Sequence, residues 1–182
     1  MTTLLSFVMA NRNDGYGGAS SLKRVGNTLR ALNHFAGKYN VSLELIIVEW
    51  NPPAGRPGVE TTLPSLPNIA VVRVIKVPKW VHDAWSEPHV KAGLPHLPMM
   101  EFVAKNIGIR RANGQFVMGH ALDTIICEAW WEDVGRHDLL GRSMKENGSK
   151  GVVFRMVRVD TNVVLDGSEP IEEWERLMGA RV

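Results

Sequence analysis

The chain has 182 residues, of which 45% are hydrophobic and 22% are charged, and its formal net charge is +2. These values are typical of a single globular domain and do not indicate an intrinsically disordered chain. The net charge is too small to indicate a nucleic-acid partner. No stretch approaches the roughly 20 apolar residues of a membrane span, and no basic leader precedes the first apolar run. We therefore expect a cytoplasmic protein without a transmembrane segment.

The first predicted element is a strand at residues 4–10, LLSFVMA, whose continuous apolar run is typical of a parallel strand buried on both faces. It ends in the polar cluster Asn11-Arg12-Asn13-Asp14. Ligands of open α/β sheets bind beyond the carboxyl ends of the strands, so this cluster is a candidate site.

A glycine-rich turn at residues 15–18 precedes a predicted helix, whose apolar residues recur at helical spacing from Leu22 to Phe35 and which Gly37 ends. Such a turn can hold a phosphate at a helix N-terminus, but this one has neither the G-x-x-x-x-G-K-(S/T) nor the G-x-G-x-x-G pattern. A flexible turn followed by an N-cap serine is therefore the preferred interpretation.

Residues 41–48, VSLELIIV, predict a second strand, followed by Glu49, Trp50 and Asn51. The Pro- and Gly-rich stretch 51–67 predicts an irregular surface loop, and residues 68–77 predict a third strand. A strand, a helix and a strand in this order indicate a right-handed parallel crossover. The sequence thus predicts one α/β domain built on a mostly parallel sheet.

Residues 78–97 contain Pro88 and Pro95, which disfavour a long helix, so we expect an irregular segment that acts as a functional lid. Its three histidines lie seven residues apart, at His82, His89 and His96. Zinc ligands are usually two to five residues apart, so this spacing does not favour a shared metal site.

A helix is predicted from Met99 to about Arg111, and residues 115–118 form a fourth apolar strand. Residues 119–123 then interrupt the apolar pattern, which resumes at 125–127 and carries the single cysteine, Cys127. One cysteine cannot form an internal disulfide, and we expect it to be buried. The lone carboxylate of Asp123 at this broken strand end is a candidate functional group.

Further elements follow to the end of the chain. Residues 128–136 and 138–146 predict short helices whose tryptophans serve packing, residues 151–159 predict a strand, and PIEEWERL predicts a terminal helix.

The run AKNIGIRRANGQFVMGHALD, residues 104–123, resembles the A-(R/K)-N-x-G-I-x-x-A-x-G-x-(Y/F)-(I/V)-x-x-x-D-x-D segment of family 2 glycosyltransferases. The resemblance implies a GT-A fold, which is a Rossmann-like three-layer α/β/α sandwich. In the family the closing D-x-D chelates a divalent metal, Mn²⁺ or Mg²⁺, that holds the diphosphate of a nucleotide-sugar. Here Ala121-Leu122-Asp123 takes that place, so only Asp123 matches. His120 beside it is a second candidate ligand, with a hydrogen-bonded structural histidine as the preferred alternative.

The resemblance also implies a set of nucleotide-binding residues: Ala10, Asn11, Arg12 and Asn13 at the first strand end, Glu49 and Asn51 at the second, and Lys105 and Asn106 on the helix. Only Asn13 matches the family's first group outright, and the guanidinium of Arg12 can stack on a base or pair with a phosphate. Glu49 is either the contact to the base or a solvated loop acid. Lys105 and Asn106 either face the nucleotide or lie on an exposed helix face.

The implied function is transfer of a sugar from a UDP- or GDP-sugar to an unknown acceptor. The resemblance covers the nucleotide-binding half, about residues 3–159, while residues 160–182 would be a shortened acceptor half, and no catalytic base is assigned. One alternative is a nucleotidyltransferase of related fold, and another is a nucleotide-sugar-binding module without activity. A shortened acceptor half would leave apolar surface uncovered, which predicts self-association.

Overall fold

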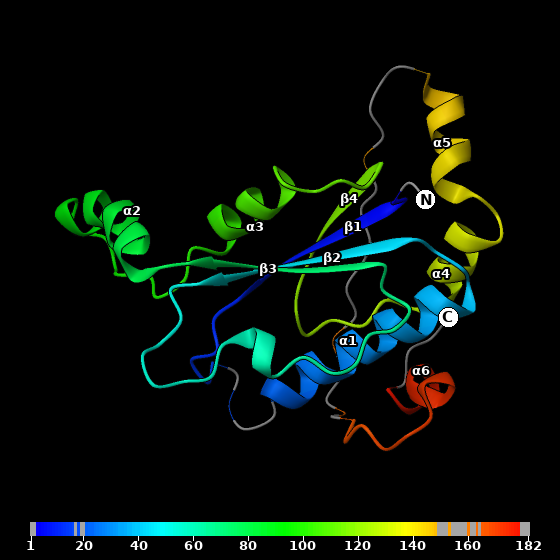
Figure 1. Cartoon of the computed structure of the whole chain (residues 1–182), viewed down its shortest axis with the longest axis horizontal. Helices are drawn as coiled ribbons and strands as arrows, with labels where there is room; N and C mark the ends of the chain where they lie inside the picture. Colours follow the sequence, from blue (N-terminus) through cyan, green and yellow to red (C-terminus); the bar gives the residue numbers. More distant parts are fainter. Residues whose placement is uncertain are drawn as a thin grey trace.

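The computed structural model describes residues 3–16, 18, 21–148, 153, 160, 163 and 165–178. Within these residues the chain forms a four-stranded, all-parallel sheet in the order β3-β2-β1-β4, with helices on both faces (Figure 1). The strands are β1 (Leu5–Asn11), β2 (Leu43–Trp50), β3 (Val71–Val77) and β4 (Phe116–His120). The helices are α1 (Ser21–Lys38), α2 (Lys79–Lys91), α3 (Glu101–Ile109), α4 (Glu128–Gly135), α5 (Leu139–Asn147) and α6 (Trp174–Leu177), with 3-10 turns η1 (Val59–Thr61) and η2 (Ile171–Glu173).

The predicted α/β class and parallel sheet are confirmed. All eight residues of β2 are buried, and so are the first five of β1, because both strands lie between two helical layers. β1 pairs with β2 from Leu5↔Leu43 onwards and with β4 up to Met9↔His120. The first four predicted strands occur within a few residues of their expected bounds, and the fold is consistent with a Rossmann-like domain.

Each face of the sheet carries its own apolar core. One core lies under α1 and α4 and contains Phe7, Leu45 and Trp131, with the rings of Phe7 and Trp131 stacked at 5.8 Å between centroids. The other lies under α3 and contains Val8, Ile46 and Ala104. The predicted packing role of the tryptophans is confirmed for Trp131, which is buried, and Trp174 is buried as well.

Helix α3 approaches the sheet closely at Gly108. A Cβ atom at this position would lie 2.4 Å from Val8 Cγ1 and 3.2 Å from Val48 Cγ2. The glycine of the AKNIG run therefore has a packing role, which lets α3 approach β1 and β2 closely.

Three sequence predictions were wrong. Residues 79–91 form helix α2 although Pro88 lies inside it. The proline removes the N–H partner of the Ala84 carbonyl, and both residues are exposed, so solvent can take the place of the lost donor.

The other two wrong predictions concern residues 125–127. These residues are a loop rather than a resumed strand, and Cys127, which precedes α4, is exposed. An apolar run of three residues is too short to specify a strand.

The C-terminal segment packs against α1. The Asn27 side chain donates to the Leu165 carbonyl at 3.0 Å, and the guanidinium of Arg30 lies 5.3 Å from the centre of the Trp174 ring. The predicted terminal helix is confirmed as η2 and α6. The predicted strand at 151–159 lies outside the described residues, apart from Val153. Gly17 of the predicted glycine-rich turn and Ser20 before α1 also lie outside them. In the described part of the chain, no helix combines the length and hydrophobicity of a membrane span.

Candidate functional site at the carboxyl ends of the strands

The strand order creates a topological switch point between β1 and β4. From β1 the chain proceeds to β2 on one side, whereas β4 is placed on the other side of β1. Ligands of open α/β sheets bind in the crevice beyond the carboxyl ends of two such strands. Asn11 and Arg12 lie at the end of β1, and His120 and Asp123 lie at the end of β4. The sequence-predicted candidates are therefore concentrated where this rule expects a site.

Asp123 lies in the turn after β4 and its side chain is 47% exposed. Its Oδ2 lies 3.5 Å from Nε of Arg24, in the first turns of α1. The carboxylate is thus accessible to a ligand and has a cation beside it. Arg24 is not among the site residues predicted from the sequence; the basic pair Lys23-Arg24, which follows the glycine-rich turn after four residues, was a signal only for the nucleotidyltransferase alternative.

His120 is buried and supports the turn that carries Asp123. Its Nε2 lies 2.7 Å from the Thr124 carbonyl oxygen, which can only accept, so Nε2 carries the proton. Its ring packs edge-on against Phe7 at 5.5 Å between centroids. Burial lowers the pKa of His120, which favours the neutral ring. Ligation of a metal through Nε2 would require the bond to Thr124 to break, so the geometry favours the structural alternative.

Arg12 connects the ends of β1 and β2. Its Nε donates to the Asn51 carbonyl at 2.9 Å, and its Nη1 pairs with Asp14 Oδ2 at 2.5 Å. Burial raises the pKa of Asp14, but bonds from the Tyr16 N–H and from Arg12 outweigh it, so the pKa is lowered and the ion pair is maintained. Asn13 is directed elsewhere, because its side chain donates to the Pro57 carbonyl at 3.1 Å.

Glu49 is fully buried, contrary to the alternative of a solvated loop acid. Its Oε1 accepts from the Val59 N–H of η1 at 2.7 Å, whereas its Oε2 has no hydrogen-bond partner among the described residues. Asn51 is also buried and adopts a left-handed φ of 45°. The loop that carries η1 therefore covers Glu49, and a base contact by this carboxylate requires that loop to open.

Lys105 and Asn106 differ in their surroundings. Lys105 pairs with Glu101 at 2.6 Å and its side chain is 17% exposed, whereas Asn106 is exposed on the outside of α3. The charges of Lys105 and Asp123 both act on the pKa of His120, in opposite directions. Lys105 and Asp123 thus lie within electrostatic reach of the same ring, while Asn106 fits the exposed-face alternative.

The site offers limited protein ligands for a metal. Among the described residues, no three His, Cys, Asp or Glu side chains are grouped to hold an ion. Mg²⁺ and Mn²⁺ prefer oxygen ligands, and Mg²⁺ is commonly bound by one or two carboxylates together with substrate phosphates. Asp123 fits this requirement as a single carboxylate, provided that a ligand supplies phosphate oxygens.

Comparison with known proteins gives no match to any family model, curated protein or solved structure. The function is therefore argued from the geometry of this chain alone.

Proposed function

We propose that the chain binds a nucleoside-diphosphate sugar, with UDP or GDP as the nucleotide, at the switch point between β1 and β4, and transfers the sugar to an acceptor. The observation that carries the proposal is the exposed carboxylate of Asp123 at the end of β4, with the cation of Arg24 beside it. Lys105 acts electrostatically on the same His120 ring as Asp123 does. The negative charge of a diphosphate has to be neutralised by cations around it. A divalent metal held by one carboxylate together with the phosphate oxygens can supply part of that positive charge. The resemblance of residues 104–123 to family 2 glycosyltransferases supports the same assignment.

Each residue would have a distinct role in this reaction. Asp123 would hold the metal, Mn²⁺ or Mg²⁺, and Arg24 would orient that carboxylate. When bound, the metal would supply Lewis-acid stabilisation of the charge on the leaving diphosphate. Lys105, whose side chain is mostly buried against the protein, would neutralise part of the phosphate charge. His120 would keep the turn in place through its bond to Thr124.

Calorimetric titration tests the donor site. UDP, GDP, CMP and the corresponding sugars are titrated into the native chain with and without Mn²⁺, and into Asp123→Ala. We expect metal-dependent binding of one nucleotide class, weakened at least about tenfold in the variant, which corresponds to about 1.4 kcal/mol. Asp133→Ala is the matched control, because Asp133 is an exposed aspartate outside the proposed site, with its carboxylate 3.0 Å from a ring nitrogen of His137. A nucleotide affinity that changes neither on addition of Mn²⁺ nor in Asp123→Ala would rule out the proposal.

A second candidate function is nucleotidyl transfer. Gly15 and Gly18 have φ values of 84° and 77°, conformations that favour glycine, and the Arg56 guanidinium lies against Gly15. A glycine turn with the Arg56 guanidinium beside it is the kind of feature that a triphosphate substrate requires. Release of pyrophosphate from a nucleoside triphosphate would favour this reaction, and release of a nucleoside diphosphate would favour sugar transfer. Binding without either product would support a module that has no catalytic activity.

A further inference from the structure

Helix α2 and the loop after it, residues 79–97, form an arm that projects from the body of the molecule (Figure 1). Only His82 and Ser86 are buried among the 13 residues of α2. An isolated helix of this length is marginally stable in water, because most helical stability in proteins comes from packing. The arm therefore has far less tertiary support than α1 or α3.

A chain of hydrogen bonds nevertheless fixes the arm. Trp50 Nε1, which can only donate, lies 2.9 Å from His82 Nδ1, so Nδ1 accepts and the proton of the neutral ring is on Nε2. This Nε2 lies 3.3 Å from Nε2 of His96, to which it donates. The bond holds the loop against the helix. It also excludes His82 Nε2 as a metal ligand in this arrangement, so these two histidines do not form a metal site.

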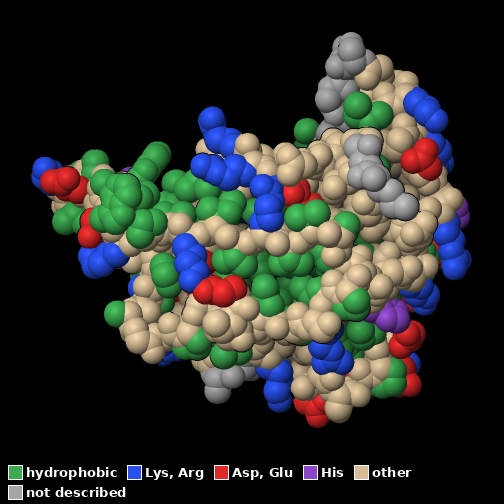
Figure 2. Space-filling view, viewed as in Figure 1, with side chains coloured by type: hydrophobic (Ala, Val, Ile, Leu, Met, Phe, Trp, Pro, Cys, Tyr) green, Lys and Arg blue, Asp and Glu red, His purple; other side chains and the backbone are tan. Residues whose placement is uncertain are grey.

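The arm exposes large apolar side chains: Trp80 (73% exposed), Trp85 (57%), Val90 (50%), Leu94 (53%) and Leu97 (54%). Figure 2 shows hydrophobic side chains gathered over this end of the molecule. Trp80 lies on the opposite face of α2 from His82, so it is not part of this patch. If a fully exposed large side chain offers about 200 Å², the other four residues offer on the order of 400 Å². One partner of a standard interface buries about 800 Å², so the patch suits a weak protein interface.

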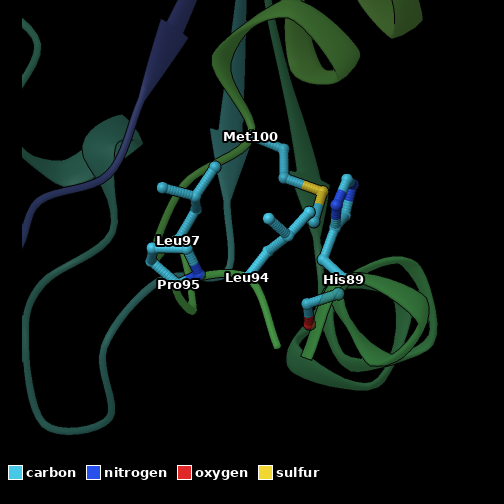
Figure 3. Close-up of a pocket in the computed structure, with 6 residues that line it drawn as sticks. His89, Leu94, Pro95, Leu97 and Met100 are labelled. Carbon is cyan, nitrogen blue, oxygen red and sulfur yellow. The ribbon is translucent and has the colours of Figure 1, made fainter. Parts of the chain in front are cut away.

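The same surface contains a cavity of about 240 Å³. It is lined by Ser86, His89, Leu94, Pro95, Leu97 and Met100, and Figure 3 shows Leu94, Leu97 and Met100 converging with His89 around it. Small-molecule sites usually enclose about 300 to 1,000 Å³, so the volume is below that range and is closer to the size of one large side chain. Trp85 lies one helical turn before His89, on the same side of α2 as the rim of the cavity.

The charges of the arm favour a protein partner over an anionic membrane. Its two lysines are paired within the helix, Lys79 with Asp83 at 2.7 Å and Lys91 with Glu87 at 2.6 Å. The arm therefore presents no net positive charge, whereas helices that bind anionic lipid carry a basic polar face. A surface that has both a projecting tryptophan and an apolar cavity beside it is complementary to itself, which a two-fold interface requires.

We propose that the arm is a homodimer interface, in which Trp85 of each copy inserts into the cavity beside Leu94 and Leu97 of the other. The occupant of the cavity is thus a second copy of this chain. The dimer is independent of the proposed nucleotide-sugar site, since none of the arm residues belongs to that site.

Sedimentation velocity from about 1 µM to about 100 µM tests the interface, because an apolar patch below standard size predicts micromolar affinity. We expect the native chain to dimerise in this range. Trp85→Ser and Leu97→Asp should each raise the dissociation constant by about 30-fold or more, as expected for hot-spot residues. Trp80→Ser is the matched control, because Trp80 is a more exposed tryptophan on the face of α2 away from His82. Circular dichroism verifies that each variant is folded, which these half-exposed positions should allow.

Two outcomes would overturn the proposal. The first is a native chain that remains monomeric at about 100 µM, a concentration above the micromolar affinity expected for this interface. The second is a dimer that Trp85→Ser and Leu97→Asp leave intact, since its interface would then lie elsewhere. Co-sedimentation of the native chain with phosphatidylserine vesicles is measured in parallel. A monomer that binds the vesicles through Trp85 would replace the dimer by a membrane surface as the occupant of the arm.

Discussion

Strand β2 carries two buried glutamates, and their surroundings differ at its two ends. Glu44, near the start, receives four hydrogen bonds, whereas Glu49, near the end, receives one from Val59 and keeps an oxygen without a partner among the described residues. Both side chains are almost completely inaccessible. The difference separates Glu44, each of whose oxygens accepts two hydrogen bonds, from Glu49, whose Oε2 accepts none among the described residues.

The network around Glu44 connects distant segments of the chain. Its Oε2 accepts from the Ser6 hydroxyl at 2.5 Å and the Asn113 N–H at 2.9 Å, and its Oε1 accepts from Arg73 at 2.7 Å and the Asn113 side chain at 3.1 Å. Ser6 in turn accepts from the Gly114 N–H at 2.8 Å. The turn between α3 and β4 is thereby fixed to β1, β2 and β3. A buried charge with this many donors stabilises only while all its partners remain.

The largest predicted effect is on stability, from Glu44→Gln. All four hydrogen bonds to Glu44 come from donors, so the amide NH₂ of glutamine would face a donor and the pair with Arg73 would lose its charge. We expect the free energy of unfolding to fall by about 3 kcal/mol or more. Urea denaturation measures it, with Glu132→Gln as the control, because the Glu132 pair with Arg136 is on the surface and contributes about 0.5 kcal/mol or less. A loss equal to that of the control would show that the network is not stabilising.

Acidification should affect the same region. Burial raises the pKa of Glu44, but the bonds from Asn113 and Ser6 and the charge of Arg73 outweigh it, so the pKa is below its ordinary value of 4.5. The unfolded chain therefore takes up this proton first as the pH falls. The stabilisation is complete above about pH 4.5 and is lost as the pH falls through the lower, folded-state pKa. Between about pH 6 and about pH 3, the stability of Glu44→Gln should decline less steeply than that of the native chain, and parallel profiles would contradict the assignment.

The third prediction is that the same substitution at the other end of β2 has a small effect. In Glu49→Gln the side-chain oxygen can still accept from the Val59 N–H, and the NH₂ occupies the position that has no partner. The free energy of unfolding should change by less than about 1 kcal/mol, whereas Glu49→Ala should cost about 1 to 3 kcal/mol because it leaves Val59 unpaired. Urea denaturation of both variants measures these changes. If Glu49→Gln lowered the free energy of unfolding as much as Glu44→Gln does, the two glutamates at the ends of β2 would not differ in their contribution to stability.

The sequence predicted the parts of the fold that depend on local pattern. Residues 4–10 and 41–48 are apolar at nearly every position, and such runs have few alternatives to a strand buried on both faces. Helix α2 was not predicted, because Pro88 was treated as a helix breaker. Since Pro88 and Ala84 are exposed, water can donate to the Ala84 carbonyl in place of the N–H that proline lacks. Cys127 escaped because a three-residue apolar run carries too little information to decide burial.

The candidate site was predicted only where it depends on strand ends. Asp123 could be selected from the sequence because it follows β4, and its exposure leaves that prediction open to a direct test. The burial of Glu49 depends on η1 folding back over β2, a contact across a loop whose irregular sequence does not specify it. Glu44 was not selected at all, because its partners Ser6, Arg73 and Asn113 are distant in the sequence and meet only in the folded sheet.

The smallest predicted effect on stability is that of Asp123→Asn. This variant gives the clearest test of whether Asp123 serves ligand binding, whereas Glu44 serves stability. The ion pair between Asp123 and Arg24 spans 3.5 Å between half-exposed side chains, so solvent screens it and its loss should change the free energy of unfolding by less than about 0.5 kcal/mol. Asparagine keeps the size of the side chain but not the charge that a divalent metal requires. Urea denaturation and nucleotide titration on the same sample should therefore give unchanged stability and lost metal-dependent binding. If Asp123→Asn instead destabilised the chain as Glu44→Gln does, Asp123 would be a structural residue like Glu44.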